Sequence, residues 1–503
     1  MDSYTPFLFP SGRLVSLTQH HPLKPYHATT TADEMAFRNH VQSRVIGCDG
    51  KIQTPFGEQK IKYFDFTASG RFHKDIEEEL NENALPYMAN THSETSATAR
   101  IITGYYHNAF QKIAHYVNAT DDDILIPVGC GSTGAINRLI HVLGLRMPDW
   151  CKSEFANLQK RPLVMRSLME HHSNDIAWRE TIADLEYVAF QPDGTLDLNH
   201  LEELLKKHAG TRMIIGTFSA ASNVTGIRND TTAIARVLHR YGAFAFFDYA
   251  AAAPHVAIDM HPDEESAKDA VFISTHKCIG GPRTPGLLIA NRALFQNTTP
   301  IEPGGGTVLY TSPWDHRYLP DITSRETGGT PPIMQSIQAG LVFDLKERIG
   351  IARIEAIESD YLKRAINRWQ GNPNLILLGR LDTKRLGIVS VIFKGIHHEL
   401  AVALLNDRYG IQVRGGCMCA GPYGHELLHI DEMHSKFIRD LLDHGRSAAK
   451  PGWVRISLGA TVTEEDFQIL LEAVDFVAKE GKSLESEYEY EESHNTWQYK
   501  SQN

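Results

Sequence analysis

This chain of 503 residues lacks three features: long apolar runs, an excess of basic residues and a leader-like start. It contains no stretch of about 20 apolar residues, so we expect no helix that spans a bilayer. The net charge of −11 argues against a nucleic-acid partner, whose phosphates attract clustered Lys and Arg. The N-terminal stretch Met1-Asp2-Ser3-Tyr4 is not a basic segment followed by an apolar core, so we predict no secretory signal.

Cysteine is also scarce. Six cysteines in a chain of this length do not make a disulfide framework, and only Cys417 and Cys419 are close together in the sequence. This usage is typical of a reducing compartment, and we expect an intracellular, cytoplasmic protein. With 42% apolar and 22% charged residues, the composition is that of a globular enzyme or binding protein. The length predicts two or three subdomains.

Strand and helix signals alternate between about residues 60 and 330. Amphipathic stretches such as 198–208 and 231–241 separate most of the apolar runs. The runs typical of buried strands are 123–128, 163–165, 186–190, 213–218, 243–247 and 270–273. This order predicts an α/β fold with a mostly parallel sheet and helices on both faces.

The pattern changes after Thr330-Pro331-Pro332. Two long helices are predicted there, followed by a smaller α+β segment that includes an additional helical stretch at 430–444. The tail from residue 483 is rich in Glu, Tyr, Ser and Gln, which predicts disorder. The predicted regions are an N-terminal arm or small-domain segment (1–59), a large α/β domain (60–332), a small C-terminal α+β domain (333–482) and a disordered tail (483–503).

One turn carries the first chemical signal. The apolar run 270–273 leads into Ser274-Thr275-His276-Lys277, and Gly280-Gly281-Pro282 closes the turn. A lysine between a strand and a glycine-rich turn is well placed to form a Schiff base with a carbonyl cofactor. On this stretch alone, a solvated surface lysine remains the alternative.

Polar groups follow three other strands. Gly131-Ser132-Thr133-Gly134 offers N–H groups and hydroxyls to an anion, although such a turn is often only a tight turn. Glu170-His171-His172-Ser173-Asn174 supplies an imidazole, and Ser222-Asn223-Val224-Thr225-Gly226 supplies an amide; each is otherwise a polar loop. The glycine spacing matches neither GxxxxGK nor GxGxxG, which disfavours nucleotide binding.

Asp248 directly follows the apolar run 243–247. A carboxylate at the end of a buried strand is costly unless it has a cationic partner. A protonated pyridine nitrogen is such a partner, and this pairing tunes pyridoxal phosphate as an electron sink. A cap of the following turn is the alternative role for Asp248.

Taken in order, these segments resemble the class V aminotransferase family, of pyridoxal-phosphate fold type I, and within it the cysteine desulfurases. The resemblance runs from about residue 63 to 480 and includes Gly329-Thr330-Pro331, Arg414-Gly415-Gly416-Cys417-Met418-Cys419-Ala420 and Arg455. It implies a homodimeric enzyme with pyridoxal 5′-phosphate as cofactor and L-cysteine as substrate. It is also compatible with a protein partner that accepts the sulfur.

The resemblance implies a role for each matching residue. Lys277 would bind the aldehyde and move the α-proton, Asp248 would pair with the ring nitrogen, and His171 would stack on the ring. Cys419 would accept the substrate sulfur as a persulfide, with release of alanine. The other implied cofactor contacts are Ser132, Thr133, Asn223, Ser274, His276 and Thr330, the last one from the partner subunit. The implied substrate contacts are His92, Asn223, Arg414 and Arg455.

The sequence departs from the family pattern at three places. Ala251 stands where the family usually has a Gln that bonds the ring hydroxyl, and Cys417 stands where many relatives have His. The chain between Cys419 and Arg455 is also longer than is typical. This insert borders the expected substrate entrance and bears on the identity of the substrate and of the sulfur acceptor.

Other functions fit parts of the pattern. Another class V reaction (transamination, epimerisation, or selenocysteine or C–S lysis) would use Lys277, Asp248 and His171 equally but would not need Cys419. A non-catalytic protein that retained the fold is disfavoured, because it would not need Lys277 and Asp248. A remote alternative is a zinc hydrolase, because His425-Glu426-Leu427-Leu428-His429 matches HExxH and would present both imidazoles on one face if helical. The metzincin position for a third ligand falls on Ser435, and we predict no metal site.

Overall fold

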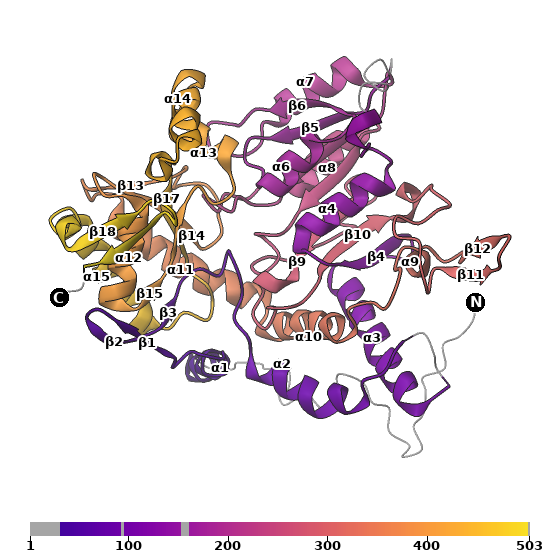
Figure 1. Cartoon of the computed structure of the whole chain (residues 1–503), viewed down its shortest axis with the longest axis horizontal. Helices are drawn as coiled ribbons and strands as arrows, with labels where there is room; N and C mark the ends of the chain where they lie inside the picture. Colours follow the sequence, from indigo (N-terminus) through magenta and orange to yellow (C-terminus); the bar gives the residue numbers. More distant parts are fainter. Residues whose placement is uncertain (1–30, 92–94, 152–159, 501–503) are drawn as a thin grey trace.

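The computed structural model describes residues 31–91, 95–151 and 160–500 of the chain. Figure 1 shows a large α/β body and, beside it, a smaller α+β body built from the C-terminal third of the chain. None of the described helices combines the length and the apolar character needed to cross a membrane.

The large body is organised by a seven-stranded sheet in the order β4-β10-β9-β8-β7-β5-β6. Its strands are β4 (Asp123–Val128), β5 (Leu163–Ser167), β6 (Asp184–Val188), β7 (Ile214–Ser219), β8 (Phe244–Asp248), β9 (Ala270–Ser274) and β10 (Gly286–Asn291). Only β10 is antiparallel to its neighbours, with Gly286 opposite Ser274 on β9 and Val128 on β4. The prediction of a mostly parallel sheet is confirmed; β10, a short apolar run directly after the Lys277 turn, was not predicted.

Helices cover both faces of this sheet (Figure 1). One buried apolar cluster joins α4 and α6 to one face, and another joins α3, α8 and α10 to the other. The described residues of the large body form the helices α2 (Lys74–Glu79), α3 (Ala97–Tyr116), α4 (Gly131–Val142), α6 (His172–Arg179), α7 (Leu198–His208), α8 (Thr231–Arg240), α9 (Ile322–Arg325) and α10 (Ile333–Ile349). The hairpin of β11 (Val308–Thr311) and β12 (His316–Tyr318) projects from this body (Figure 1).

The small body has a four-stranded sheet in the order β13-β14-β17-β16 and its own apolar core. Its strands are β13 (Leu375–Leu377), β14 (Ile388–Phe393), β16 (Arg414–Gly416) and β17 (Trp453–Ser457); its helices are α11 (Ile351–Trp369), α12 (His398–Tyr409), α13 (Gly421–Leu427), α14 (Glu432–Asp443) and α15 (Glu464–Glu480). Helix α14 is the helix predicted at 430–444.

The segment near residue 60 packs differently from the predicted division. Strand β3 (Lys62–Tyr63) pairs with β15 (Ile411–Gln412), and Phe64 and Phe66 lie in the core of the small body. The N-terminal region contributes helix α1 (Thr31–Ser43) and a hairpin of β1 (Lys51–Thr54) and β2 (Gly57–Lys60), which contacts α12. The chain therefore crosses from the small body to the large one at residues 64–71.

The prediction of a disordered tail is wrong for residues 483–500. Strands β18 (Tyr488–Glu491) and β19 (Thr496–Tyr499) form a hairpin that packs on α12. Tyr488 is 2% exposed and belongs to the core of the small body, and Trp497 Nε1 donates to His397 Nδ1 at 3.2 Å. Alternating aromatic residues bury one face of the hairpin, and this outweighs the polar composition of the tail.

The tail contributes to stability through this contact. We expect Tyr488→Ala to lower the free energy of unfolding by about 3 kcal/mol, because an aromatic side chain leaves a cavity in the core. Urea denaturation would measure this change. Glu489→Ala, on the exposed face of the same strand, is the matched control and should change the stability little. Equal midpoints for the two variants would contradict the packed tail.

Candidate active site

Five parts of the chain meet at one edge of the sheet. They are the carboxyl ends of β7 and β8, the segments that follow β5 and β9, and the start of α4. They surround a cavity of about 190 Å³. Among the residues that line it are eight predicted site residues: Ser132, Thr133, His171, Asn223, Asp248, Ser274, His276 and Lys277. The fold therefore brings together groups that are up to 145 positions apart (277 − 132) in the chain. This is where ligands bind in parallel α/β sheets.

Lys277 ends a short 3-10 turn, Thr275–Lys277, directly after β9. The chain packs closely behind this turn: Gly70 N donates to His276 O at 2.9 Å, and a Cβ on Gly70 would lie 1.9 Å from the carbonyl oxygen of Cys278. Burial lowers the pKa of Lys277 to about 8, although the negative charge of Asp248 opposes this effect. A buried amine with a lowered pKa is suited to attack a carbonyl group near neutral pH.

Asp248 is the last residue of β8 and is 4% exposed. Its Oδ1 accepts a hydrogen bond from Ala250 N at 2.8 Å. Burial raises the pKa of Asp248, while that hydrogen bond and the charge of Lys277 lower it. The carboxylate is thus held by the backbone in a cavity where a cationic partner would stabilise its charged form.

The start of α4 forms the end of the cavity that is best suited to an anion. Ser132 N donates to Ser274 Oγ at 2.9 Å, and Gly131, the first residue of α4, has a φ of 57°. Thr133 Oγ1 and Ser173 Oγ lie 2.6 Å apart. Burial lowers the pKa of His276 to about 4, so its ring is neutral at pH 7. A helix N-terminus with several hydroxyls matches a phosphate group.

His171 lies immediately before α6 and accepts a hydrogen bond from Ser173 N through Nδ1 at 3.2 Å. Burial lowers the pKa of His171 to about 3, and the charge of Lys277 acts in the same direction. The imidazole is therefore neutral and fixed in orientation, as a ring that stacks on a planar cofactor must be.

The sequence prediction missed a buried carboxyl below this site. Glu170 is 1% exposed and accepts hydrogen bonds from Ser167 Oγ at 2.6 Å, Asn174 Nδ2 at 2.7 Å and Ser219 Oγ at 2.7 Å. Burial raises the pKa of Glu170 to about 7, although these hydrogen bonds lower it. Ser173 and Ser219, which line the cavity, were also missed. A carboxyl directly before His171 was the only sequence signal for this network.

The two predicted substrate arginines meet at Asp65, which the sequence prediction also missed. Arg455 Nη2 donates to Asp65 Oδ1 at 2.8 Å, and Arg414 Nε lies 3.2 Å from Asp65 Oδ2. Arg455 is 3% exposed, and its Nη1 donates to Asn223 O at 3.2 Å. Burial lowers the pKa of Arg455, and Asp65 opposes this effect. Arg455 is therefore held beside the cavity, next to Asn223.

Cys419 is exposed, on a loop that is anchored to the site. Asn223 Nδ2 donates to Met418 O at 2.7 Å, and His172 N donates to Cys419 O at 2.8 Å. Met418 and Cys419 both have a φ of 55°, which is rare for residues other than glycine. Strain of this kind costs about 1 kcal/mol or more per residue and is concentrated at functional sites.

Thr330 and His92 are the remaining predicted residues. Thr330 is exposed, accepts a hydrogen bond from Asn90 Nδ2 at 3.2 Å and does not line the cavity of its own chain. His92 lies outside the described residues. Ala251 does line the cavity, at the position where the family usually has Gln.

The HExxH segment does not have the geometry of a zinc site. Helix α13 ends at Leu427, and His429 has a φ of 53°, so no helical face presents both imidazoles. The two ring nitrogens of His425 lie 2.8 Å from Gly421 O and Ser435 Oγ. Within residues 31–91, 95–151 and 160–500, no group of three or more His, Cys, Asp or Glu residues is arranged to hold a metal ion.

A half-buried lysine in the turn after β9 and a buried aspartate at the end of β8 line one cavity with a helix N-terminus. This arrangement defines the class of a cofactor-dependent α/β enzyme. The sequence profile described as aminotransferase class-V matches residues 62–470, and the chain belongs to this family.

Individual relatives support the same placement. The chain is 30% identical over 371 residues to a probable cysteine desulfurase of Halalkalibacterium halodurans, a match that covers 72% of this chain and 84% of the relative. It is 29% identical to one of Streptomyces coelicolor, with the same coverage. The fold is similar to that of a cysteine desulfurase from Thermococcus onnurineus, with a TM-score of 0.68, 23% identity and coverage of 83% of this chain and 95% of the other. It is also similar to one from Escherichia coli, with a TM-score of 0.67, 21% identity and coverage of 87% and 97%.

Proposed function

We propose that the cavity binds pyridoxal 5′-phosphate. The observation that supports this most directly is that the Lys277 amine and the Asp248 carboxylate line the same cavity, where the charge of each favours the charged form of the other. The donor set fits the group: an amine for the aldehyde, a carboxylate for the ring nitrogen, a neutral imidazole for the ring face and hydroxyls at a helix N-terminus for the phosphate. When bound, this cofactor withdraws electrons from the carbon that bears the amino group of a substrate.

We further propose that the substrate is L-cysteine and that the protein is a cysteine desulfurase. Arg455, held by Asp65, would bind the substrate carboxylate through its planar fork, with Asn223 beside it. Lys277 would take the α-proton and later return a proton during product formation. Cys419 would attack the substrate sulfur as a thiolate, because only the thiolate is nucleophilic. The C–S bond breaks as the S–S bond forms, and carbon keeps the electron pair and takes a proton, which yields alanine and a persulfide on Cys419.

The reaction products distinguish this function from a transaminase. We expect purified protein with pyridoxal phosphate, L-cysteine and a thiol reductant, which releases the persulfide sulfur as sulfide and restores the Cys419 thiol, to form alanine continuously without an added 2-oxo acid. A transaminase would instead need a 2-oxo acid to regenerate its cofactor. Alanine formation that depends on an added 2-oxo acid would contradict the desulfurase and favour transamination.

The six cysteines are all unpaired thiols, which supports a reducing intracellular compartment for this chemistry.

The lowered pKa of Lys277 predicts how cofactor capture depends on pH. With a pKa of about 8, the fraction of Lys277 that carries a neutral amine rises from about one tenth at pH 7 to about nine tenths at pH 9. We expect the capture rate of pyridoxal phosphate by cofactor-free protein, followed by absorbance, to rise about tenfold over this range and then level off. A lysine of ordinary pKa would give a rate that still rises about tenfold per pH unit at pH 9, and that result would contradict the buried amine.

We also propose a homodimer in which Thr330 serves the partner's cofactor. Thr330 does not line the cavity of its own chain. Its hydrogen-bond partner is Asn90, and apolar side chains shortly before Asn90 in the sequence are exposed: Leu85 by 47%, Tyr87 by 41% and Met88 by 48%. On the β11–β12 hairpin, Tyr310 is 63% exposed and Trp314 is 90% exposed. Such side chains are costly to leave in water and are typical of the centre of an interface.

Analytical ultracentrifugation tests the dimer. We expect the wild type to sediment as a dimer and Tyr310→Glu/Trp314→Glu to weaken association by about a hundredfold or more, because buried aromatic residues contribute about 2 kcal/mol each at interfaces. The matched control is Met433→Glu/Phe437→Glu on α14, where both side chains are similarly exposed. A monomeric wild type, or equal weakening by both pairs, would contradict this interface.

A further inference from the structure

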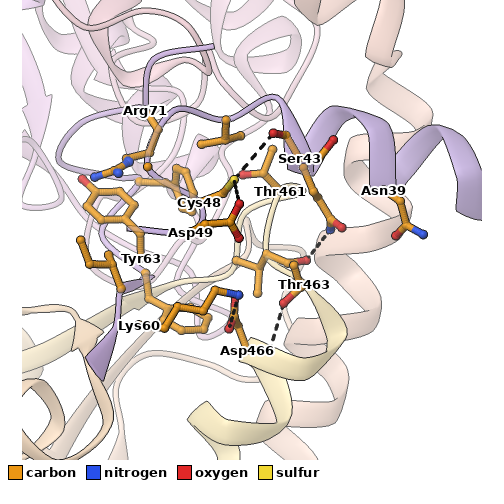
Figure 2. A pocket seen from close by; sticks show the side chains of 17 residues that line it. Asn39, Ser43, Cys48, Asp49, Lys60, Tyr63, Arg71, Thr461, Thr463 and Asp466 are labelled. Carbon is orange, nitrogen blue, oxygen red and sulfur yellow. Dashed lines mark hydrogen bonds and ion pairs between the residues drawn. The ribbon is translucent and has the colours of Figure 1, made fainter. Parts of the chain in front are cut away.

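A second cavity, of about 260 Å³, lies between α1, the segment from β2 to β3 and the start of α15 (Figure 2). It shares no lining residue with the cavity around Lys277. Helix α1 is attached over it by the hydrogen bond from Gln42 Nε2 to Val462 O, at 2.8 Å. We call this cavity the N-terminal pocket.

The charges that line the N-terminal pocket are balanced. Two cations, Lys60 and Arg71, face two carboxylates, Asp49 and Asp466. Such a lining does not favour a polyanion such as a nucleotide, nor a polycation. It favours a small ligand that carries one charge of each sign.

Arg71 has the features of an anion-binding group. Its guanidinium lies 5.0 Å from the centre of the Tyr63 ring, and its Nη2 donates to Ile46 O at 3.1 Å. Within the part of the chain that the structure describes, no carboxylate forms an ion pair with Arg71. The remaining N–H groups of the fork can therefore bind a carboxylate.

Two side-chain oxygen atoms of the pocket need a hydrogen-bond donor. Thr461 Oγ1 and Asp466 Oδ1 are both buried from solvent and have no hydrogen-bond partner within the described residues. Lys60 Nζ lies 3.7 Å from Asp466 Oδ1, which is an ion-pair distance but too long for a hydrogen bond. Figure 2 shows Arg71 and Asp466 on opposite sides of the pocket, with the ring of Tyr63 on its wall. An unsatisfied buried acceptor costs about 1–3 kcal/mol, so a ligand N–H group is favoured at this end.

We propose that the N-terminal pocket binds one α-amino acid with an apolar side chain. The carboxylate lies on Arg71, the ammonium group donates to Asp466 and Thr461, and the side chain packs on the apolar wall formed by Val45, Ile61 and Phe64. This is a binding site separate from the substrate site.

The wall of the pocket is continuous with the catalytic centre. Arg71 O accepts a hydrogen bond from Gly280 N at 2.7 Å, and Gly70 N donates to His276 O, so both residues contact the turn that carries Lys277. Asp65, two residues after Tyr63, holds Arg455. A ligand that fixes Tyr63 and Arg71 therefore acts on the segment that positions Arg455. Resting on the proposed function, we expect the bound amino acid to change the KM for L-cysteine.

Calorimetric titration of the cofactor-loaded protein with L-leucine tests the site without turnover. We expect saturable binding of one molecule per chain with no change in cofactor absorbance. Two analogues test the two ends: isopentylamine lacks the carboxylate and 4-methylpentanoate lacks the ammonium group. Each should bind at least tenfold more weakly than leucine. Equal binding of either analogue would overturn the proposal.

Variants locate the binding. We expect Arg71→Gln and the nearly isosteric Thr461→Val each to weaken leucine binding about tenfold. Arg292→Gln is the matched control, because Arg292 Nη2 also donates to one backbone carbonyl, that of Asp121, at 3.1 Å.

A variant beside the catalytic cavity, Arg455→Met, should retain leucine binding. Loss in Arg455→Met alone would place leucine in the catalytic cavity, and absence of saturable binding below about 1 mM would show no site; either result overturns the proposal. Because binding is read without turnover, a failed desulfurase assay does not decide it.

Discussion

Lys277→Ala should lose the cofactor absorbance of the wild type and at least about a thousandfold of the rate of alanine formation from L-cysteine. The amine has two roles in this account: it holds the aldehyde of the cofactor, and it moves the α-proton. A general base alone contributes about a hundredfold to ten-thousandfold to a rate, and loss of the covalent attachment adds to this. Absorbance spectra and an alanine assay measure the two effects.

The control is Lys346→Met, because Lys346 is also buried and burial also lowers its pKa to about 8. Its Nζ donates to Val256 O at 2.6 Å, away from the catalytic cavity. We expect Lys346→Met to reduce stability but to keep the cofactor spectrum of the folded fraction. Retained cofactor absorbance and activity in Lys277→Ala would contradict the assignment of the amine.

Cys419→Ala should bind the cofactor as the wild type does and lose about a hundredfold or more of alanine formation. The thiolate is the group that breaks the C–S bond, and no other group in the proposed mechanism takes the sulfur. We expect the cofactor spectrum to be unchanged because Cys419 does not line the cavity, and the hydrogen bond from His172 N to its backbone oxygen does not involve the side chain. Absorbance with and without L-cysteine, together with alanine formation, separates these two effects.

Cys417→Ala is the matched control in the same loop, two positions earlier. Cys417 is partly buried, whereas Cys419 is exposed. We expect Cys417→Ala to retain alanine formation within a fewfold of the wild type. If Cys417→Ala is inactive and Cys419→Ala is active, the assignment of the two cysteines is reversed. If both variants are fully active, no cysteine of this loop accepts sulfur.

The sequence predicts which residues lie together in the cavity where each residue follows an apolar strand. Ser132, His171, Asn223, Asp248 and Lys277 all come after buried runs, and parallel strands bring such positions to one edge of the sheet. Local pattern and general topology are sufficient to place these groups near one another. The placement did not require knowledge of individual side-chain contacts.

Long-range pairing explains what the sequence prediction missed. Asp65 holds Arg455 across 390 positions, and the carboxyl of Glu170 contacts Ser219 across 49 positions. Neither partner has a local signal, because a single Asp or Glu in a loop is usually solvated. The tail was mispredicted for a related reason: the polar composition hides an alternation that buries Tyr488 only when the core of the small body is present.

The most direct test of the account is the mass of the Cys419 peptide after incubation of cofactor-loaded protein with L-cysteine and capture of thiols by alkylation. We expect this peptide to gain the mass of one sulfur atom in the wild type and in the Cys417→Ala variant, and to gain none in Lys277→Ala. A Cys419 peptide that never carries extra sulfur, in protein that forms alanine from L-cysteine, would contradict it.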